Sequence, residues 1–137
     1  MINCIFCKIA QHEMNAHIVY EDDHVVAFLD IQPRSPGHTM VIPKHHVANL
    51  SELPDAQGAP FFSAGKKITD IVRSALNPDG FTLGMNYGEA SGQEVQHMHF
   101  HIMPRWAHDG GGPIQRVVMN VPEENVAALA KKIRDVQ

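Results

Sequence analysis

The chain has 137 residues, of which 44% are hydrophobic and 19% are charged, and its formal net charge is −4. These values are typical of one globular domain that buries its own core, and they exclude a disordered chain. The negative net charge argues against a nucleic-acid partner. No apolar run reaches the roughly 18 residues that predict a membrane-spanning helix.

The N-terminal segment contains a Cys-x-x-Cys pair, Cys4 and Cys7, without the basic start and apolar core of a signal peptide. We therefore expect a cytoplasmic chain, in which a disulfide is disfavoured. Thioredoxin-like redox chemistry is weakly supported, because it needs a strand before the pair and only three residues precede Cys4. Two interpretations remain: thiols without a special function, or half of a zinc site that needs two more ligands.

The first half of the chain predicts three short strands, at residues 17–20, 25–30 and 38–42. The second of them is apolar enough to be central in a sheet. Prolines and a glycine mark the loop between the second and third strands, and Pro43 closes the third.

A long helix is expected after Ser51, where the spacing of apolar residues changes to three and four. Pro60 predicts that the regular helix starts near it or is kinked there. Residues 77–80 end the helix, and residues 81–86 predict a fourth strand. The apolar face of the helix consists of Phe61, Ala64, Ile68, Ile71, Val72 and Ala75.

The end of the chain begins with three consecutive glycines, which predict a loop. Residues 117–119 predict a short strand. Pro122 and the two acidic residues after it predict the start of a last helix through Ile133, with basic residues in its last turn. Together these elements predict an α+β fold in which mostly antiparallel strands are grouped around one long helix.

The stretch from Gln93 to Arg105 carries the strongest chemical signal, because His97, His99 and His101 alternate with apolar residues. A strand would place the three imidazoles on one face and the apolar side chains on the other, and Pro104 would end the strand or place it at an edge. A single metal held by all three is disfavoured, because the outer α-carbons would lie ~13 Å apart. A half-exposed, histidine-rich strand and a nucleophilic histidine with two helpers both remain open.

The segment at residues 97–103, His-Met-His-Phe-His-Ile-Met, resembles the His-x-His-x-His-x-x motif of the histidine triad (HIT) family of nucleotide hydrolases and transferases. The resemblance covers about residues 3–106, and residues 107–137 would be a C-terminal extension of a single domain, 1–137. It implies a five-stranded antiparallel sheet with one long helix and a C-terminal helix, and a homodimer. Residues 4–9, 20–23, 27–31, 36–38, 41–44, 86–88 and 92–93 also follow the order and spacing of the family.

By this resemblance His99 attacks the α-phosphorus of a nucleotide and becomes nucleotidylated, and water then releases a nucleoside monophosphate. The main-chain carbonyl of His97 would hold the Nδ1–H of His99 and leave Nε2 free. His101 and His38 would surround the phosphate. Covalent catalysis by histidine requires no bound Mg²⁺, and the chain has no Walker motif.

The resemblance also implies a set of nucleotide-binding residues. Asp30 occupies the position that binds the ribose hydroxyls, a task that suits a carboxylate. Five apolar residues match positions around the base, although each of them is equally compatible with plain core packing: Phe6, Ile9, Phe28, Ile31 and Met40. Asn86 and Gln93 match amides on the phosphate side, where Val95 supplies a main-chain amide.

Position 94 departs from the family pattern. Many members carry Ser or Thr there, whose hydroxyl donates to the phosphate or the leaving group, whereas this chain has Glu94. An ionised carboxylate donates nothing and repels phosphate, so Glu94 either points away or is protonated and acts as an acid.

Two substrate classes fit the resemblance, a nucleoside phosphoramidate and a dinucleoside polyphosphate, with a purine base. Residues 104–106, Pro-Arg-Trp, resemble the polyphosphate-cleaving branch more than the Gly-Gly-Arg ending of the phosphoramidase branch. The alternative from another functional class is a zinc-stabilised purine-nucleotide-binding interaction protein with vestigial hydrolase activity.

Some relatives in the wider superfamily bind zinc through an N-terminal cysteine pair, a histidine after an Ile-Pro-Lys segment and the first triad histidine. In this chain the pattern implies Cys4, Cys7, His46 and His97, because the Pro-Lys-x-His spacing selects His46 over His45. Four protein ligands leave no open position on zinc, so this ion would be structural and not catalytic.

Overall fold

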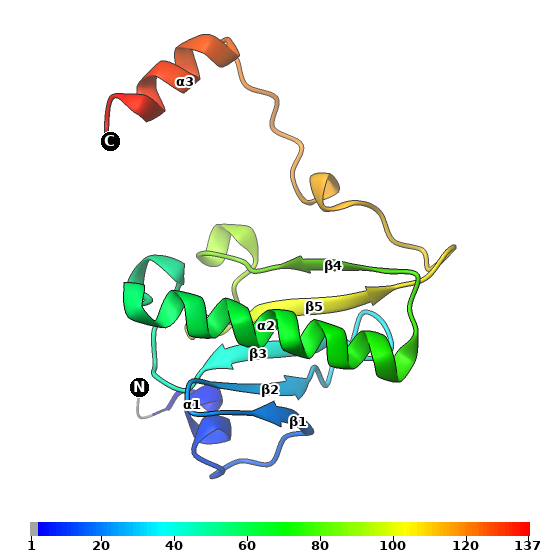
Figure 1. The fold of residues 1–137 in the computed structure, drawn as a ribbon. Coiled ribbons are helices and arrows are strands. Elements are labelled where there is room, and N and C mark those ends of the chain that lie inside the picture. Colours follow the sequence, from blue (N-terminus) through cyan, green and yellow to red (C-terminus); the bar gives the residue numbers. More distant parts are fainter. Residues whose placement is uncertain (1–2) are drawn as a thin grey trace.

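The computed structural model describes residues 3–137. Its centre is one antiparallel sheet with the strand order β1-β2-β3-β5-β4 (Figure 1). The predicted α+β class and five-stranded sheet are therefore confirmed. The strands are β1 (Ile18–Glu21), β2 (Val25–Leu29), β3 (Thr39–Pro43), β4 (Gly80–Gly84) and β5 (Phe100–Arg105).

One face of the sheet is covered by α2 (Asp55–Leu76), which follows a short 3₁₀ turn, η1 (Leu50–Glu52) (Figure 1). Most of the predicted helical face is buried, but Ile71 and Ala75 are exposed and lie off it. Pro60 lies inside the helix and not at its start. It is tolerated because its missing N–H removes only one bond close to the helix N-terminus.

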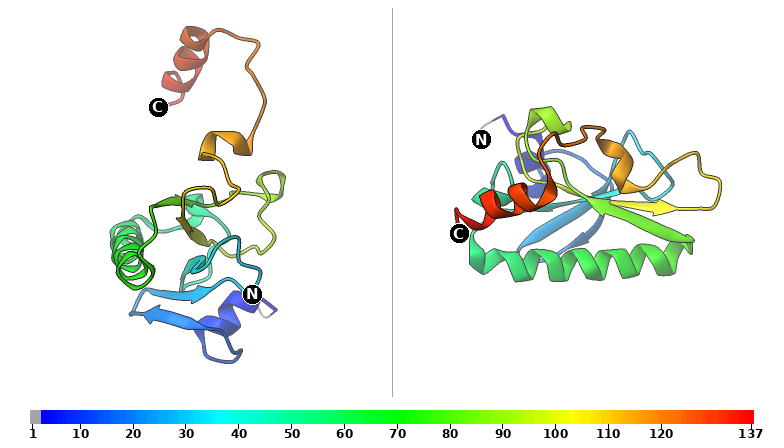
Figure 2. Two further views of the ribbon diagram at one scale, coloured as in Figure 1. Left: turned by 90° about the vertical axis from the view of Figure 1, so that its right-hand side faces the viewer. Right: turned by 90° about the horizontal axis from the view of Figure 1, so that it is seen from above.

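The opposite face is covered by α1 (Ile5–Ala10), a short helix that the sequence did not predict (Figure 2). Successive residues of a strand point to opposite faces, so β2 and β3 feed two separate cores. Val25, Ala27 and Val41 pack with α2, whereas Val26, Phe28, Met40 and Ile42 pack with Phe6 and Ile9 of α1. This arrangement explains why β2 is apolar throughout and why every residue of β3, the polar Thr39 included, is buried.

Strand β5 begins at Phe100, so the predicted strand across residues 97–103 is wrong at its start. The main chain leaves the sheet there because other groups replace the β3 partners. The Met98 N–H donates to the Val47 carbonyl at 2.7 Å, and His97 Nε2 lies 2.8 Å from the carbonyl oxygen of Pro43. At the other end, Pro104 does not stop the strand, because β5 pairs only with β4 beyond Ile102.

The C-terminal extension follows β5 in the chain and projects from the sheet on the side of β4 (Figures 1 and 2). It contains a 3₁₀ turn, η3 (Ile114–Val117), and α3 (Val126–Arg134), and a second such turn, η2 (Glu89–Ser91), precedes β5. The predicted strand at 117–119 is wrong. The last helix starts later than predicted, because the Asn125 side chain caps it by accepting the Ala128 N–H at 2.8 Å. Within residues 3–137, no helix has the length and apolar character to cross a membrane.

Candidate active site and cysteine–histidine cluster

His99 lies just before β5 and is only 7% exposed. Its Nδ1 is 2.7 Å from the main-chain oxygen of His97. A carbonyl only accepts, so Nδ1 must carry the proton, and in a neutral imidazole Nε2 then keeps its lone pair. The structure therefore holds His99 in the tautomer that an attacking histidine requires.

A second pair of imidazoles lies beside His99. The Arg34 N–H donates to His38 Nδ1 at 3.1 Å, so the proton of a neutral His38 is on Nε2. That Nε2 is 2.9 Å from His101 Nδ1 and 3.7 Å from a carboxylate oxygen of Asp30. His101 Nδ1 therefore accepts, and the remaining N–H of His101, on Nε2, is available to an anionic group.

The ligand atoms of Asp30, His38 and His101 lie within 4.8 Å of one another, close enough for a metal site. The tautomers argue against that use. A cation on His38 Nε2 would have to displace its proton, and the imidazole would become an anion because Nδ1 already accepts the Arg34 N–H. The two imidazoles are better described as a hydrogen-bonded pair, with the Asp30 carboxylate 3.7 Å from His38 Nε2.

Burial keeps these two imidazoles uncharged at neutral pH. Desolvation lowers the pKa of His38, and it lowers the pKa of His101 to about 4, with further contributions from His99 and His38. A charged His101 would lose the Nδ1 lone pair that accepts from His38, and a charged His38 would lose the lone pair that accepts the Arg34 N–H. The tautomers described above are therefore the forms expected at pH 7.

The lowered pKa of His101 predicts that acid destabilises the fold. Between the ordinary value of 6.5 and about 4, the unfolded chain binds a proton that the folded chain does not. The free energy of unfolding should therefore fall as the pH decreases through this window, by on the order of 1–2 kcal/mol from this residue. Urea unfolding at pH 7 and pH 5 measures the change, and His101→Gln should remove part of it. An unchanged pH dependence in the variant would contradict the assignment.

The residues predicted around the base are mostly brought together. Phe6, Ile9, Phe28 and Met40 form one buried cluster, and Val95 packs against it. The Phe6 ring meets the His99 ring edge-on, with 5.2 Å between the ring centroids. The exception is Ile31, which is 83% exposed and lies outside the cluster.

Gln93 has a role that the sequence did not reveal. Its side chain is buried, and Oε1 accepts the Gly88 N–H at 2.8 Å. Its Nε2 donates to the carbonyls of Ala48 at 2.6 Å and Val95 at 3.0 Å. Both amide protons are thus used by main-chain groups, and Gln93 fixes the loop before His97; the predicted contact with phosphate stays a prediction.

Asn86 and Glu94 are both exposed on the segments that lead to β5. Within residues 3–137, Glu94 has no ion-pair partner. Its exposure is compatible with both alternatives that the sequence left open, a side chain that points away and one that acts as an acid.

The four predicted zinc ligands lie together, with all donor atoms within 4.8 Å of one another. Cys4 Sγ and Cys7 Sγ are 3.4 and 3.6 Å from His97 Nδ1, and Cys7 Sγ is 3.2 Å from His46 Nδ1. Two ligands of a tetrahedral zinc ion, one sulfur and one nitrogen, are about 3.5 Å apart. The donor set and its spacing therefore fit such an ion.

The protonation state of His97 also fits a zinc ion. His97 Nε2–H donates to the Pro43 carbonyl at 2.8 Å, so the Nδ1 lone pair faces the two sulfurs. Burial lowers the pKa of His97 to about 4 and keeps the imidazole neutral. Burial and the neighbouring Cys4 raise the pKa of Cys7 to about 11, and a bound cation would reverse that shift. Both cysteines are free thiols in the structure.

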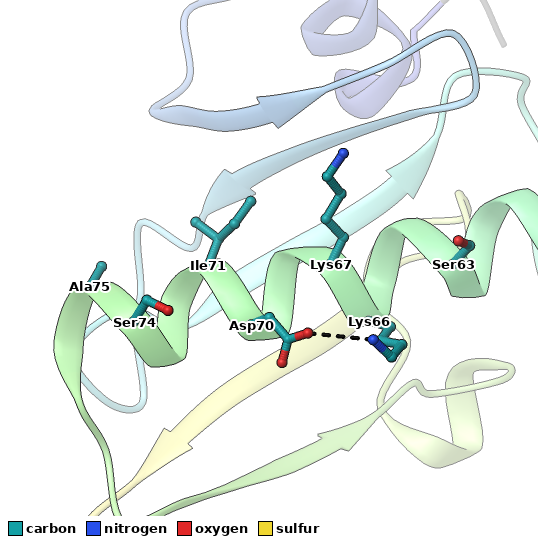
Figure 3. A pocket seen from close by; sticks show the side chains of 7 residues that line it. All are labelled: Ser63, Lys66, Lys67, Asp70, Ile71, Ser74 and Ala75. Carbon is teal, nitrogen blue, oxygen red and sulfur yellow. Dashed lines mark ion pairs between the residues drawn. The ribbon is translucent and has the colours of Figure 1, made fainter.

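A shallow depression of about 650 Å³ lies along α2, away from these groups (Figure 3). Lys66 and Asp70, whose charged atoms are 3.5 Å apart, line it together with two serines, Lys67, Ile71 and Ala75. It contains no imidazole or thiol, so it does not compete with the histidine site as the place of chemistry.

Comparisons with known proteins agree with the fold and the motif. The family model of the HIT domain matches residues 11–108. An uncharacterised HIT-like protein of Methanocaldococcus jannaschii is 49% identical over 107 residues, which cover 78% of this chain and 82% of the relative. A crystal structure of a HIT family member from Bacillus subtilis aligns with this chain at a TM-score of 0.85 and 39% sequence identity. The alignment covers 98% of this chain and 94% of the Bacillus chain.

Two more distant relatives have named activities. An adenosine 5′-monophosphoramidase of Schizosaccharomyces pombe is 35% identical over 132 residues, which cover 96% of each chain. An adenylylsulfatase of Arabidopsis thaliana is 39% identical over 107 residues, which cover 78% of this chain and 54% of the relative.

Proposed function

The chain belongs to the HIT family, and on that basis we propose that it hydrolyses nucleotides at the α-phosphate through a nucleotidyl intermediate on His99. The observation that carries this proposal is the 2.7 Å contact between His99 Nδ1 and the His97 carbonyl, which leaves Nε2 unprotonated. A bond forms from Nε2 to the α-phosphorus while the bond to the leaving group breaks. Water then attacks the same phosphorus, and a nucleoside monophosphate and free His99 result.

The neighbouring residues suit the remaining tasks. The free N–H of His101 would donate to a non-bridging oxygen of the phosphate, and His38 keeps His101 in the required tautomer. Asp30 would accept the ribose hydroxyls. The cluster around Phe6 and Phe28 offers an aromatic surface to a purine base.

The charge of the site favours a nucleoside phosphoramidate over a dinucleoside polyphosphate. Two neutral imidazoles and the Asp30 carboxylate do little to compensate the several charges of a polyphosphate, whereas a phosphoramidate carries one on its phosphorus. Arg105, which suggested the polyphosphate branch, is engaged elsewhere. Its Nε is 2.7 Å from Asp109 Oδ2, and its NH1 donates to Thr82 at 2.9 Å.

The test compares adenosine phosphoramidate with diadenosine polyphosphates under identical conditions. We expect a larger kcat/KM for the phosphoramidate and, after a rapid acid-free quench, a protein mass increased by one adenylyl group. Higher kcat/KM for the polyphosphates would reverse the substrate assignment. Nucleotide binding without turnover or adduct would favour the alternative, an interaction protein with vestigial activity.

We also propose a structural zinc ion held by Cys4, Cys7, His46 and His97, in a cytoplasmic protein whose thiols stay reduced. The ion would hold the N-terminal segment beside the loop that precedes β5, and would supply no open coordination position for substrate. The matching distances between donors support this proposal.

A homodimer is the third proposal, supported by a C-terminal extension that no other element covers. On the order of 1,000 Å² of side-chain surface is offered by this segment, more than monomers usually expose in one patch. A second copy is its simplest cover, because the four basic and four acidic residues of positions 107–137 cancel and give no net attraction to an anionic membrane surface. Eight large apolar residues there are 51–89% exposed: Ile114, Val117, Val118, Met119, Val121, Val126, Ile133 and Val136.

Sedimentation should therefore give twice the chain mass of 15.2 kDa at micromolar concentration. Replacing both Met119 and Val121 by serine should shift the protein toward the monomer, because these two side chains are 89% and 84% exposed and contribute nothing to the monomer core. Asn120→Ser, between them, is the matched control. A 15.2 kDa species for the unmodified chain would contradict the proposal.

A further inference from the structure

Phe6 occupies an unusual position between the cysteine–histidine cluster and the reactive histidine. It lies in the first turn of α1, and its two flanking cysteines are both members of the cluster. Cys4 also caps the helix, since its Sγ accepts the Cys7 N–H at 3.4 Å. The backbone that carries Phe6 is therefore held at both ends by the cluster.

The Phe6 ring extends from this segment to the reactive histidine. Its centroid is 5.2 Å from that of His99 and 6.0 Å from that of His97, and both contacts are edge-on. Phe6 is 6% exposed and also packs against Phe28 at 5.4 Å. A side chain so tightly surrounded cannot move without changing its neighbours.

His99 needs such a support. Within residues 3–137, its side chain makes a hydrogen bond at Nδ1 alone, and an imidazole fixed by one hydrogen bond can still tilt. Phe6 restricts the tilt, and the His101 ring lies 5.1 Å away as a second neighbour. Orientation matters, because a displacement of about 1 Å at a reacting atom can cost about a hundredfold in rate.

We propose that Phe6 is a positioning residue through which the Cys4, Cys7, His46 and His97 cluster sets the orientation of His99. Two links run from the cluster to the nucleophile. One is the main chain of His97, whose carbonyl holds Nδ1–H, and the other is the Phe6 ring. A helix of six residues depends on its contacts, so loss of the cluster leaves α1 held only by the packing of Phe6 and Ile9 and loosens the support of the ring. This inference rests on the proposed function of His99 and adds that the cluster controls its reactivity.

The test is a cycle of four samples: the unmodified protein and Phe6→Leu, each zinc-loaded and chelator-stripped. In the unmodified protein, stripping should slow adduct formation in a single turnover by about tenfold or more, with AMP affinity changed less than about threefold. In Phe6→Leu the loaded protein should already be slow, and stripping should slow it by a smaller factor than in the unmodified protein, because both changes act on the Phe6 link and only the His97 link remains. If Phe6 served only the base, its loss would weaken AMP binding and leave the rate at saturation unchanged.

A matched control is Phe61→Leu, the same substitution at an equally buried phenylalanine of the core beneath α2. It should lower thermal stability without changing the rate of adduct formation. If the stripped proteins unfold, the loaded Phe6→Leu and Phe61→Leu proteins decide the question: a rate loss confined to Phe6→Leu supports the proposal, and equal rates overturn it. The proposal is also overturned if stripping and Phe6→Leu each reduce the rate of adduct formation independently, so that their factors multiply. It is overturned as well if the protein takes up no zinc.

A readout without turnover separates this inference from the proposed function. Removal of zinc should shift the ring-proton NMR signals of His99 in the unmodified protein and much less in Phe6→Leu. If the loaded protein forms no adduct, the hydrolase proposal fails, while the NMR comparison still decides whether Phe6 links the cluster to His99. Equal shifts in both proteins would overturn the link.

Discussion

Replacing His99 by alanine is expected to abolish turnover while AMP affinity stays within about tenfold of that of the unmodified protein. The covalent step needs the Nε2 lone pair, and no other imidazole of the site offers one in the same place: His101 Nδ1 already accepts from His38. Binding is distributed over Asp30, the aromatic cluster and the hydrogen-bond donors of the site, so one missing ring removes little of it.

Steady-state kinetics and calorimetric titration with AMP measure the two halves of this expectation. His17→Ala, at an exposed histidine in the segment before β1, is the matched control and should leave both values unchanged. A His99→Ala protein that retains a tenth of the turnover would contradict the nucleophile assignment. The same variant should also fail to show the adenylyl mass increase, which ties the kinetic loss to the covalent step.

Features that depend on side-chain periodicity were predictable from the sequence. The buried face of α2 follows the spacing of Phe61, Ala64, Ile68 and Val72, and the apolar runs of β2 and β3 mark strands buried on both faces. Resemblance to the family supplied what periodicity does not, namely which residues lie together across the chain. Cys4 and His97 are 93 residues apart in sequence, yet Sγ and Nδ1 are 3.4 Å apart.

Features that depend on competition between hydrogen-bond partners were not predictable. The alternating pattern of residues 97–103 is correct for a strand, but the Met98 N–H donates to Val47 and the His97 ring occupies the Pro43 carbonyl of β3, so β5 starts at Phe100. Gln93 looked like a ligand-facing amide because nothing local shows that its partners are the main chain at positions 48, 88 and 95. Likewise, Asn125 caps α3 in preference to the Pro122 start that charge pattern alone suggested.

Loss of the proposed zinc ion should produce the largest change in stability of any variant considered. Metal binding to a structural cysteine–histidine site contributes free energy directly to folding, about 10–16 kcal/mol in zinc-finger peptides that lack another core. This chain has two cores of its own, so we expect a smaller effect, a decrease of about 10 °C in Tm. Cys4→Ser isolates this effect, because serine is a good helix cap and should preserve the bond that Cys4 makes to the Cys7 N–H.

The chain also offers a matched pair of histidines for this test. His46 Nδ1 faces Cys7 at 3.2 Å, whereas the adjacent His45 is exposed and is not a member of the cluster. Dialysed His46→Ala protein should therefore lose about one zinc per chain together with its thermal stability, and His45→Ala should keep both. Added zinc should raise the Tm of stripped unmodified protein and leave that of Cys4→Ser unchanged. A zinc-free protein with an unaltered Tm would contradict the site, because the four donors would then be held together by packing alone.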